Sequence, residues 1–271
     1  MKIKILGSGA SEGIPGVFCT CPICENARKM GGKNIRTRAQ SIINDKYLID
    51  FSPDTYEHSR RFNIRLTEVE HAIITHPHED HFYPAELQNR RPPFGYNNED
   101  HLLNIYGPGS MAEKYSSYKP QKNEDYVKIH VLKAFETYQI GELVVTPLTA
   151  NHARNFECFV YIIESDGKRL LIGHDSGFFP VPSMKVIESM YFDCVILDTT
   201  TGIEPDGNNH MGVNDNIKLR RDMIAAGCAS EKTIFVMSHF SHNGQLTHEQ
   251  LEEIGKDNGL QAGFDGFETE F

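Results

Sequence analysis

Four side chains of metal-ligand type follow one apolar run within six residues. The run at residues 72–74 leads into His76, His78, Asp80 and His81. Imidazole and carboxylate groups suit Zn, Mn or Fe, and alternate residues of a tight loop point in different directions, so one loop can serve two ions. A solvated polar loop is the alternative, but it does not explain this density of ligands. We therefore predict a metal site with two ions at this loop.

Four apolar runs end in a polar residue of the same kind. They are AIITH at His76, LLIGHD at Asp175, VILD at Asp198 and FVMSH at His239. One such ending is common, because polar residues begin most loops. Four endings rich in His and Asp predict that metal-type side chains gather at one rim of the sheets, where loops carry chemistry on a rigid scaffold.

Short β-rich runs and amphipathic segments alternate without a repeat or a linker. Predicted strands cover residues 2–6, 71–74, 127–132, 143–148, 159–164, 170–173, 194–197 and 233–237, with a hairpin at 41–50 around Asn44-Asp45. Predicted helices cover residues 54–61, the segment after Pro84, 183–189, 213–225 and 247–255. Strands in hairpins with interspersed helices predict an α+β fold, an αββα sandwich, formed as one domain over residues 1–271.

The composition excludes several classes of protein. The 271 residues contain no apolar run of the roughly 18 to 20 residues that a membrane helix needs, so we expect no membrane partner. The first residues resemble a strand rather than a signal peptide, which predicts a cytosolic protein. The net charge of −10 opposes the phosphate contacts that dominate nucleic-acid affinity, so we expect no long nucleic acid as a partner.

The string from Thr75 to His81 resembles the signature of the metallo-β-lactamase superfamily. Later motifs resemble the remaining ligand positions of that superfamily: His152 in TANHARN, Asp175 in GHDSG and His239 in MSHFSH. The resemblance covers the whole chain and implies a hydrolase with two metal ions. One ion would be held by His76, His78 and His152 and the other by Asp80, His81 and His239, with Asp175 bridging. Lactam-cleaving dinuclear members have a Cys at the bridging position, so we do not expect β-lactams as natural substrates.

Three cysteines form a second group of candidate ligands. Cys19, Cys21 and Cys24 place three sulfurs in one loop, one short of a closed tetrahedral site, and His242 is the predicted fourth ligand of a structural zinc. Three free thiols are the alternative, but thiolates this close repel or oxidise unless they bind a metal. No fourth cysteine is nearby, which disfavours an iron-sulfur cluster. The remaining cysteines are predicted to be ordinary buried thiols: Cys158, Cys194 and Cys228.

Three features together resemble the PhnP-type phosphodiesterases. They are the LGSG opening at residues 6–9, the cysteine loop at 19–24, and the GFDG segment at 263–266, which is predicted to be a closing strand. The resemblance implies hydrolysis of a small, cyclic ribose or nucleotide phosphodiester. It also implies two Mn or Zn ions in the active site, one structural Zn, and a homodimer.

We expect Asp80 and His210 to be catalytic residues. His210, in GNNHMG, resembles the histidine that assists proton transfer in these phosphodiesterases; an exposed loop histidine is the alternative. Arg90 and Arg91 have the chemistry to meet a phosphate oxygen, but a solvated basic pair is favoured.

Two other functions share these ligands. One is transfer-RNA 3′-end processing, which the acidic charge balance and the absence of a long basic insertion disfavour. The other is a non-catalytic, metal-binding or cofactor-chaperoning protein of the same fold. A complete ligand set argues against it, because loss of catalysis would leave some ligands free to change.

Overall fold

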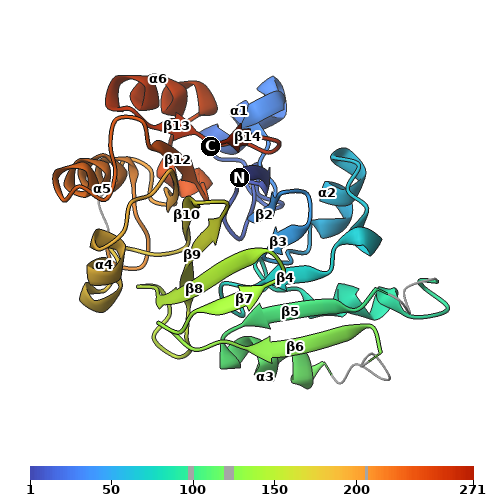
Figure 1. Cartoon of the computed structure of the whole chain (residues 1–271). Coiled ribbons are helices and arrows are strands. Elements are labelled where there is room, and N and C mark those ends of the chain that lie inside the picture. The colour runs from blue at the N-terminus through green and yellow to red at the C-terminus, as the bar shows by residue number, and fades with distance from the viewer. Residues whose placement is uncertain (97–100, 119–124, 205–206) are drawn as a thin grey trace.

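The computed structural model describes residues 1–96, 101–118, 125–204 and 207–271. Within these ranges the chain forms two seven-stranded sheets packed face to face, with helices on both outer faces (Figure 1). This is the predicted αββα sandwich. The two termini lie side by side, and the Met1 amino group donates to the Phe271 oxygen at 2.9 Å.

The first sheet combines antiparallel pairs at one end with parallel pairs at the other. Its spatial order is β14 (Glu268–Glu270), β1 (Lys2–Gly7), β2 (Gln40–Ile43), β3 (Tyr47–Ile49), β4 (His71–Ile73), β5 (Leu103–Gly107) and β6 (Val127–Val131). The β2–β3 hairpin turns at Asn44 and Asp45, whose φ angles of 50° and 57° identify the left-handed positions of a tight hairpin turn. The predicted hairpin is therefore confirmed.

The second sheet runs in the order β13 (Gln261–Ala262), β12 (Ile234–Ser238), β11 (Cys194–Asp198), β10 (Lys168–Gly173), β9 (Phe159–Ser165), β8 (Leu143–Thr149) and β7 (Tyr138–Ile140). The strands β10, β11, β12 and β13 are parallel neighbours. Parallel strands end at the same edge of a sheet, so the residues that follow β10, β11 and β12 come together. This is the rim predicted from the apolar runs.

The helices lie on the outside of the sheets (Figure 1). They are α1 (Pro22–Met30), α2 (Thr55–Arg61), α3 (Gly109–Ser117), α4 (Val181–Glu188), α5 (Val213–Ala225) and α6 (His248–Asn258), with 3-10 turns η1 (Gly32–Asn34), η2 (Leu66–Glu68), η3 (Pro84–Arg90) and η4 (His242–Gly244). No helix within the described ranges is long and apolar enough to cross a membrane.

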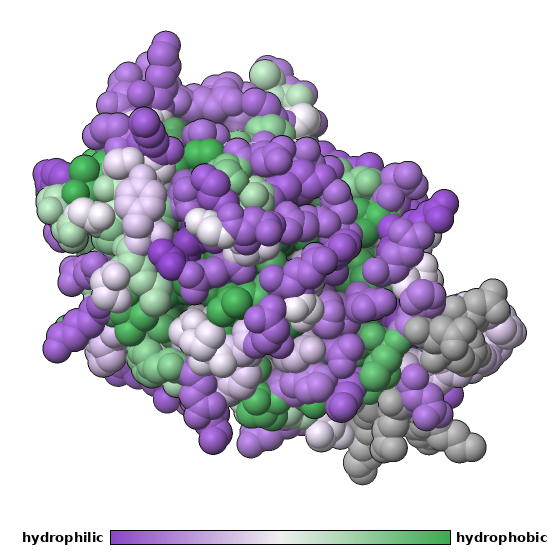
Figure 2. Space-filling view, viewed as in Figure 1, coloured by the Kyte–Doolittle hydropathy of each residue, from purple (hydrophilic) through white to green (hydrophobic). Residues whose placement is uncertain are grey.

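Strand β9 shows how the apolar pattern builds two of the core layers. Phe159, Tyr161 and Ile163 point between the two sheets, while Val160 and Ile162 point toward the outer helices, and all five are buried. Successive side chains of a strand face opposite sides, so a strand buried on both faces needs a continuous apolar run. The face of the molecule shown in Figure 2 is largely hydrophilic.

Two predicted elements differ from the structure. The segment after Pro84 forms a 3-10 turn rather than an α-helix. Residues 263–266 form a turn between β13 and β14, so the predicted closing strand there is wrong. The turn at residues 263–266 is explained by Asp265, whose buried carboxylate accepts hydrogen bonds from the backbone N–H groups of Ser8 and Thr37. The aspartate thus ties this turn to two distant segments.

Several short elements were not predicted. Helices α1 and α3 and the strands β5, β7, β13 and β14 lack a clear signal, because each is short or carries a mixed polar and apolar pattern. Tertiary packing stabilises such elements more than their own propensity does.

Candidate metal centre

The loop after β4 supplies two histidines, His76 and His78, which meet two residues distant in the chain, His152 and Asp175. His76 Nε2 lies 2.8 Å from His78 Nδ1, and His152 Nε2 lies 3.1 Å from the same nitrogen. Ring nitrogens of His76, His78 and His152 and a carboxylate oxygen of Asp175 all lie within 4.8 Å of one another. The structure therefore assembles the first predicted ligand group.

The second predicted group assembles beside the first. His81 Nε2 lies 3.2 Å from both Asp80 Oδ2 and His239 Nε2. Asp175 Oδ2 lies 3.0 Å from His76 Nε2 and 3.1 Å from His81 Nε2, so one carboxylate oxygen contacts both groups. This is the position that a bridging ligand requires.

The electrostatics of the two groups fit divalent cations. Burial, followed by the neighbouring His81, lowers the pKa of His76 to about 3, so this imidazole is neutral and its lone pair is available to a metal. Burial opposes ionisation of Asp175, yet the imidazoles of His239 and His76 hold its pKa well below the usual range. Neutral imidazoles converging on an ionised carboxylate are the donor set that Zn or Mn prefers.

His81 is the exception among the imidazoles. Burial disfavours its charged form, but the surrounding carboxylates of Asp80 and Asp50 raise its pKa well above the ordinary value. A metal that binds His81 must therefore displace a proton.

Asp50 is a functional residue that the sequence analysis missed. Its carboxylate accepts hydrogen bonds from His81 Nδ1 at 2.7 Å, from His174 Nε2 at 3.1 Å and from the Thr75 backbone at 2.8 Å. Because Nδ1 donates to Asp50, Nε2 is the nitrogen of His81 that would lose its proton and bind a metal. The available signal was the apolar end of β3, which runs directly into Asp50.

Asp198 supports the other side of the site. Its Oδ2 lies 3.0 Å from His210 Nδ1, and its Oδ1 accepts the backbone N–H groups of Thr200 and Met211. His239 Nδ1 lies 2.8 Å from Thr200 Oγ1. The sequence placed Asp198 at the rim but did not indicate that it orients His210.

Three site residues adopt the left-handed backbone region. The φ angles are 64° for Asp50, 56° for Asp175 and 58° for His239. Each such non-glycine residue costs about 1–2 kcal/mol relative to ordinary backbone. Strained positions of this kind persist where the surrounding structure holds them, and they concentrate at functional sites.

A cavity of about 530 Å³ opens over the two ligand groups. Its floor carries most of the predicted ligands and the predicted proton donor: His78, Asp80, His152, Asp175, His210 and His239. Thus Asp80 and His210, the two predicted catalytic residues, both line the same cavity as the metal ligands.

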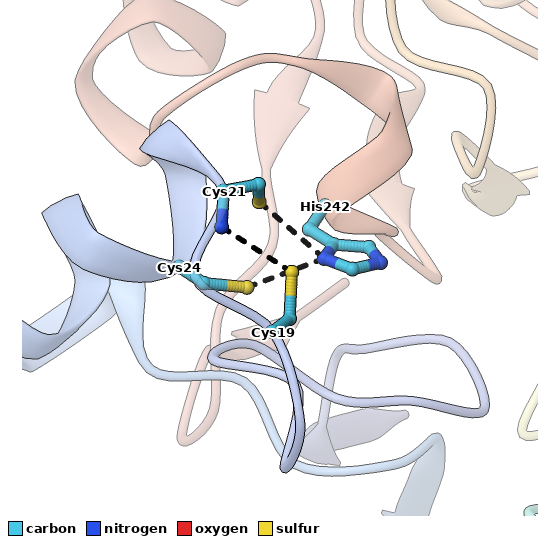
Figure 3. Close-up of side chains that lie close together, drawn as sticks. All are labelled: Cys19, Cys21, Cys24 and His242. Carbon is cyan, nitrogen blue, oxygen red and sulfur yellow. Dashed lines mark hydrogen bonds between the residues drawn. The ribbon is translucent and has the colours of Figure 1, made fainter.

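The cysteine loop and His242 also come together (Figure 3). His242 Nδ1 lies 3.2 Å from Cys24 Sγ and 3.5 Å from Cys21 Sγ, and the four candidate ligand atoms, including that of Cys19, lie within 4.8 Å of one another. Burial raises the pKa of Cys24 to about 12. Three sulfurs and one imidazole nitrogen converging on one point fit a structural zinc, which would hold the sulfurs as thiolates.

Arg90 does not join the catalytic cavity. It is half-buried and donates to the backbone oxygens of Tyr126 and His101, so the prediction of a solvated basic pair is wrong for this residue. Arg91 is also half-buried, and neither arginine is among the described residues that line the cavity. The three other cysteines are buried, as predicted: Cys158, Cys194 and Cys228.

Residues 45–240 match the model of the beta-lactamase superfamily domain. The chain belongs to the beta-lactamase superfamily. The match spans every predicted catalytic ligand, and the fold is the metallo-β-lactamase sandwich expected for this superfamily.

The curated proteins that are similar to this chain differ in their functions. This chain is 23% identical to an octanoyltransferase of Porphyromonas gingivalis. The alignment covers 99% of this chain and 51% of that protein. The chain is 30% identical to ribonuclease Z of Listeria welshimeri over 42% of this chain and 32% of that enzyme. The chain thus spans about half, or less, of these curated relatives.

A diphosphatase of the PhnP family has a similar structure, with a TM-score of 0.77, 22% identity, and coverage of 100% of this chain and 97% of that one. The predicted resemblance to PhnP-type proteins is therefore confirmed at the level of fold.

We expect this superfamily member to carry about three metal ions per chain, one of which leaves slowly, because a closed site exchanges less readily than an open pair. Elemental analysis of reconstituted protein, before and after brief chelation, measures both values. A single bound ion after full reconstitution would contradict the assignment of two separate sites.

The Cys21→Ser variant should lose the slowly exchanging zinc and unfold at a temperature lower by on the order of 10 °C. Residual activity should follow the folded fraction, since this site lies outside the catalytic cavity. Zinc content and thermal unfolding are the measurements, and Cys228→Ser is the matched control. Cys228 is a buried thiol that follows α5, donates to the Met223 backbone oxygen, and belongs to none of the candidate metal groups of the described residues. Unchanged zinc content in Cys21→Ser would exclude the structural site.

Proposed function

We propose that this protein is a dinuclear metal-dependent phosphodiesterase that hydrolyses a small, cyclic ribose or nucleotide phosphodiester. The observation that carries the proposal is the position of His210. This histidine lines the cavity, is oriented by Asp198, and lies 3.2 Å from Asp175, the residue that contacts both ligand groups. A proton donor beside a two-metal centre suits cleavage of an ester bond with a poor leaving group.

Two divalent ions, when bound, would acidify a water molecule and neutralise charge on the phosphoryl oxygens. Residues of the chain itself would orient the attacking water and protonate the leaving group. Asp80 is held ionised, since the neighbouring His81 lowers its pKa despite the opposing effect of burial, and it would orient the attacking water as a hydrogen-bond acceptor.

His210 would act on the other side of phosphorus. Its Nδ1–H donates to the Asp198 carboxylate, which fixes the ring plane. The opposite ring nitrogen would protonate the alkoxide as it leaves. Asp198 is fully buried and also accepts two backbone N–H groups, so its carboxylate is a rigid support for His210.

The cavity size supports a small substrate. A volume of about 530 Å³ lies within the range of roughly 300–1,000 Å³ typical of small-molecule sites. Transfer-RNA 3′-end processing remains the second candidate, because of the 30% identity to ribonuclease Z over part of the chain. The net charge of −10 and a cavity whose described lining residues include no Lys or Arg favour the smaller substrate.

A non-catalytic role is the third candidate, and the seven ligand residues together with the supported His210 argue against it. The expected cytosolic location and the homodimer stay predictions.

An activity screen of metal-loaded protein separates these candidates. We expect turnover of bis(4-nitrophenyl) phosphate and of nucleoside 2′,3′-cyclic phosphates, with diesters preferred over monoesters. A monoester dianion can bind both ions as a product does, and so inhibits rather than reacts. A precursor transfer RNA belongs in the same screen. Cleavage of that RNA without turnover of cyclic phosphates would favour the nuclease, and no turnover of any ester would favour the non-catalytic role.

A further inference from the structure

The part of the cavity lining that lies outside the ligand groups, called the wall below, is built from loops at the same rim. Ser11 and Glu12 follow β1, Thr201 and Glu204 follow β11, and Asn243 follows β12. Apart from Ala10, every described lining residue outside the predicted centre carries a hydroxyl, amide or carboxylate group. This wall therefore offers hydrogen bonds rather than apolar contact.

The charge of the lining is one-sided. Glu12 and Glu204 on the wall join Asp80 and Asp175 on the floor, and the described lining residues include no Lys or Arg. Within the described lining, positive charge is thus limited to the predicted metal positions and the predicted proton donor His210. A phosphoryl group is attracted there, while a second anionic group of the same ligand would lie against the carboxylates of the wall.

The carboxylate of Glu12 is held in place rather than mobile. Its Oε1 accepts a hydrogen bond from Ser241 Oγ, and its Oε2 accepts one from Ser11 Oγ at 3.3 Å. The same Oε1 lies 3.6 Å from His242 Nε2. Backbone hydrogen bonds between Ala10 and Phe240 and between Phe240 and Ser8 fix the two loops to each other. A pre-positioned acceptor of this kind binds a ligand with little loss of entropy.

We propose that Glu12 and Glu204 restrict the site to ligands whose non-reacting part carries hydroxyl donors and no second phosphate. This inference rests on the proposed function and narrows its substrate class. Carboxylates accept two or more hydrogen bonds from neighbouring hydroxyl groups, as on a ribose, whereas a second phosphate offers only acceptors and negative charge. The selectivity thus combines an attractive and a repulsive element.

Binding of product-like ligands tests the proposal without turnover. We expect zinc-loaded protein to bind adenosine 3′-monophosphate at least about tenfold more tightly than adenosine 3′,5′-bisphosphate, since like charges brought together oppose binding. In the Glu12→Gln, Glu204→Gln double variant the ratio should fall below about threefold, because glutamine keeps the acceptor for Ser241 but removes the charge. Isothermal titration calorimetry measures both ratios.

The matched control removes the same amount of charge elsewhere. Glu113 on α3 and Glu253 on α6 are exposed and do not line the cavity. The Glu113→Gln, Glu253→Gln variant should keep the wild-type ratio. Glu204→Gln alone serves as a second test variant if the double variant does not fold or loses zinc, and it should show an intermediate ratio.

Two binding results would overturn the proposal. One is bisphosphate binding as tight as monophosphate binding in the wild type, and the other is a ratio that is equal in the wild type and in the folded wall variants. Turnover is followed separately, with adenosine 2′,3′-cyclic phosphate and its 5′-phosphorylated form. If neither is hydrolysed but the binding ratios are as expected, the phosphodiesterase function fails and the ligand selectivity stands. Hydrolysis of both forms at the same kcat/KM would leave the function and reject the selectivity.

Discussion

The Asp175→Ala variant is expected to lose on the order of 10³-fold or more in kcat/KM on phosphodiesters. Several kcal/mol of transition-state stabilisation depend on two metal ions held in the correct positions. Asp175 Oδ2 lies within about 3 Å of one imidazole from each ligand group. Without this carboxylate, five imidazoles and Asp80 would have to hold two divalent ions. The metal content of the catalytic centre should therefore fall as well.

Elemental analysis and steady-state kinetics on the same preparation measure the two effects. Asp257→Ala is the control, since Asp257 is exposed on α6 and remote from the cavity. Asp175→Asn, which keeps the shape of the side chain, separates loss of charge from loss of packing. If Asp175→Ala retained two catalytic ions and the wild-type rate, the bridging assignment would be wrong.

The His210→Ala variant should lower kcat by about 10²- to 10⁴-fold on diesters with alkoxide leaving groups, the usual range for a general acid. The loss should be much smaller for bis(4-nitrophenyl) phosphate, whose leaving group scarcely needs a proton. Asp198→Asn should show the same dependence on the leaving group in weaker form, because Asp198 acts by orienting His210 at 3.0 Å.

Kinetics with both kinds of diester, for the wild type and each variant, provide the comparison. Equal losses of kcat on the two substrates would remove the general-acid role from His210. Efficient turnover of lactams or thioesters without diester hydrolysis would reject the phosphodiesterase proposal as a whole.

The sequence by itself was sufficient for the parts of this protein whose residues are close together along the chain. The crowded loop from His76 to His81 and the cysteine loop from Cys19 to Cys24 are dense, local patterns, and both assemble in the structure with distant partners that resembled known motifs, such as His152 and His242. The order of short β-rich runs, hairpins and amphipathic segments likewise predicted a layered sandwich. In that fold the continuous apolar run of β9 is buried on both faces.

Only the tertiary structure decided which single, isolated residues support the site. Asp50 and Glu12 carry no local motif that marks them. For Asp198 the sequence indicated a place at the rim, but not its hydrogen bond to His210. Asp265, likewise, makes a turn where a strand was predicted, because its carboxylate binds backbone N–H groups at Ser8 and Thr37. A carboxylate orients a histidine or replaces a strand pairing through distance and angle in space, and sequence spacing does not determine these when the partners lie far apart along the chain.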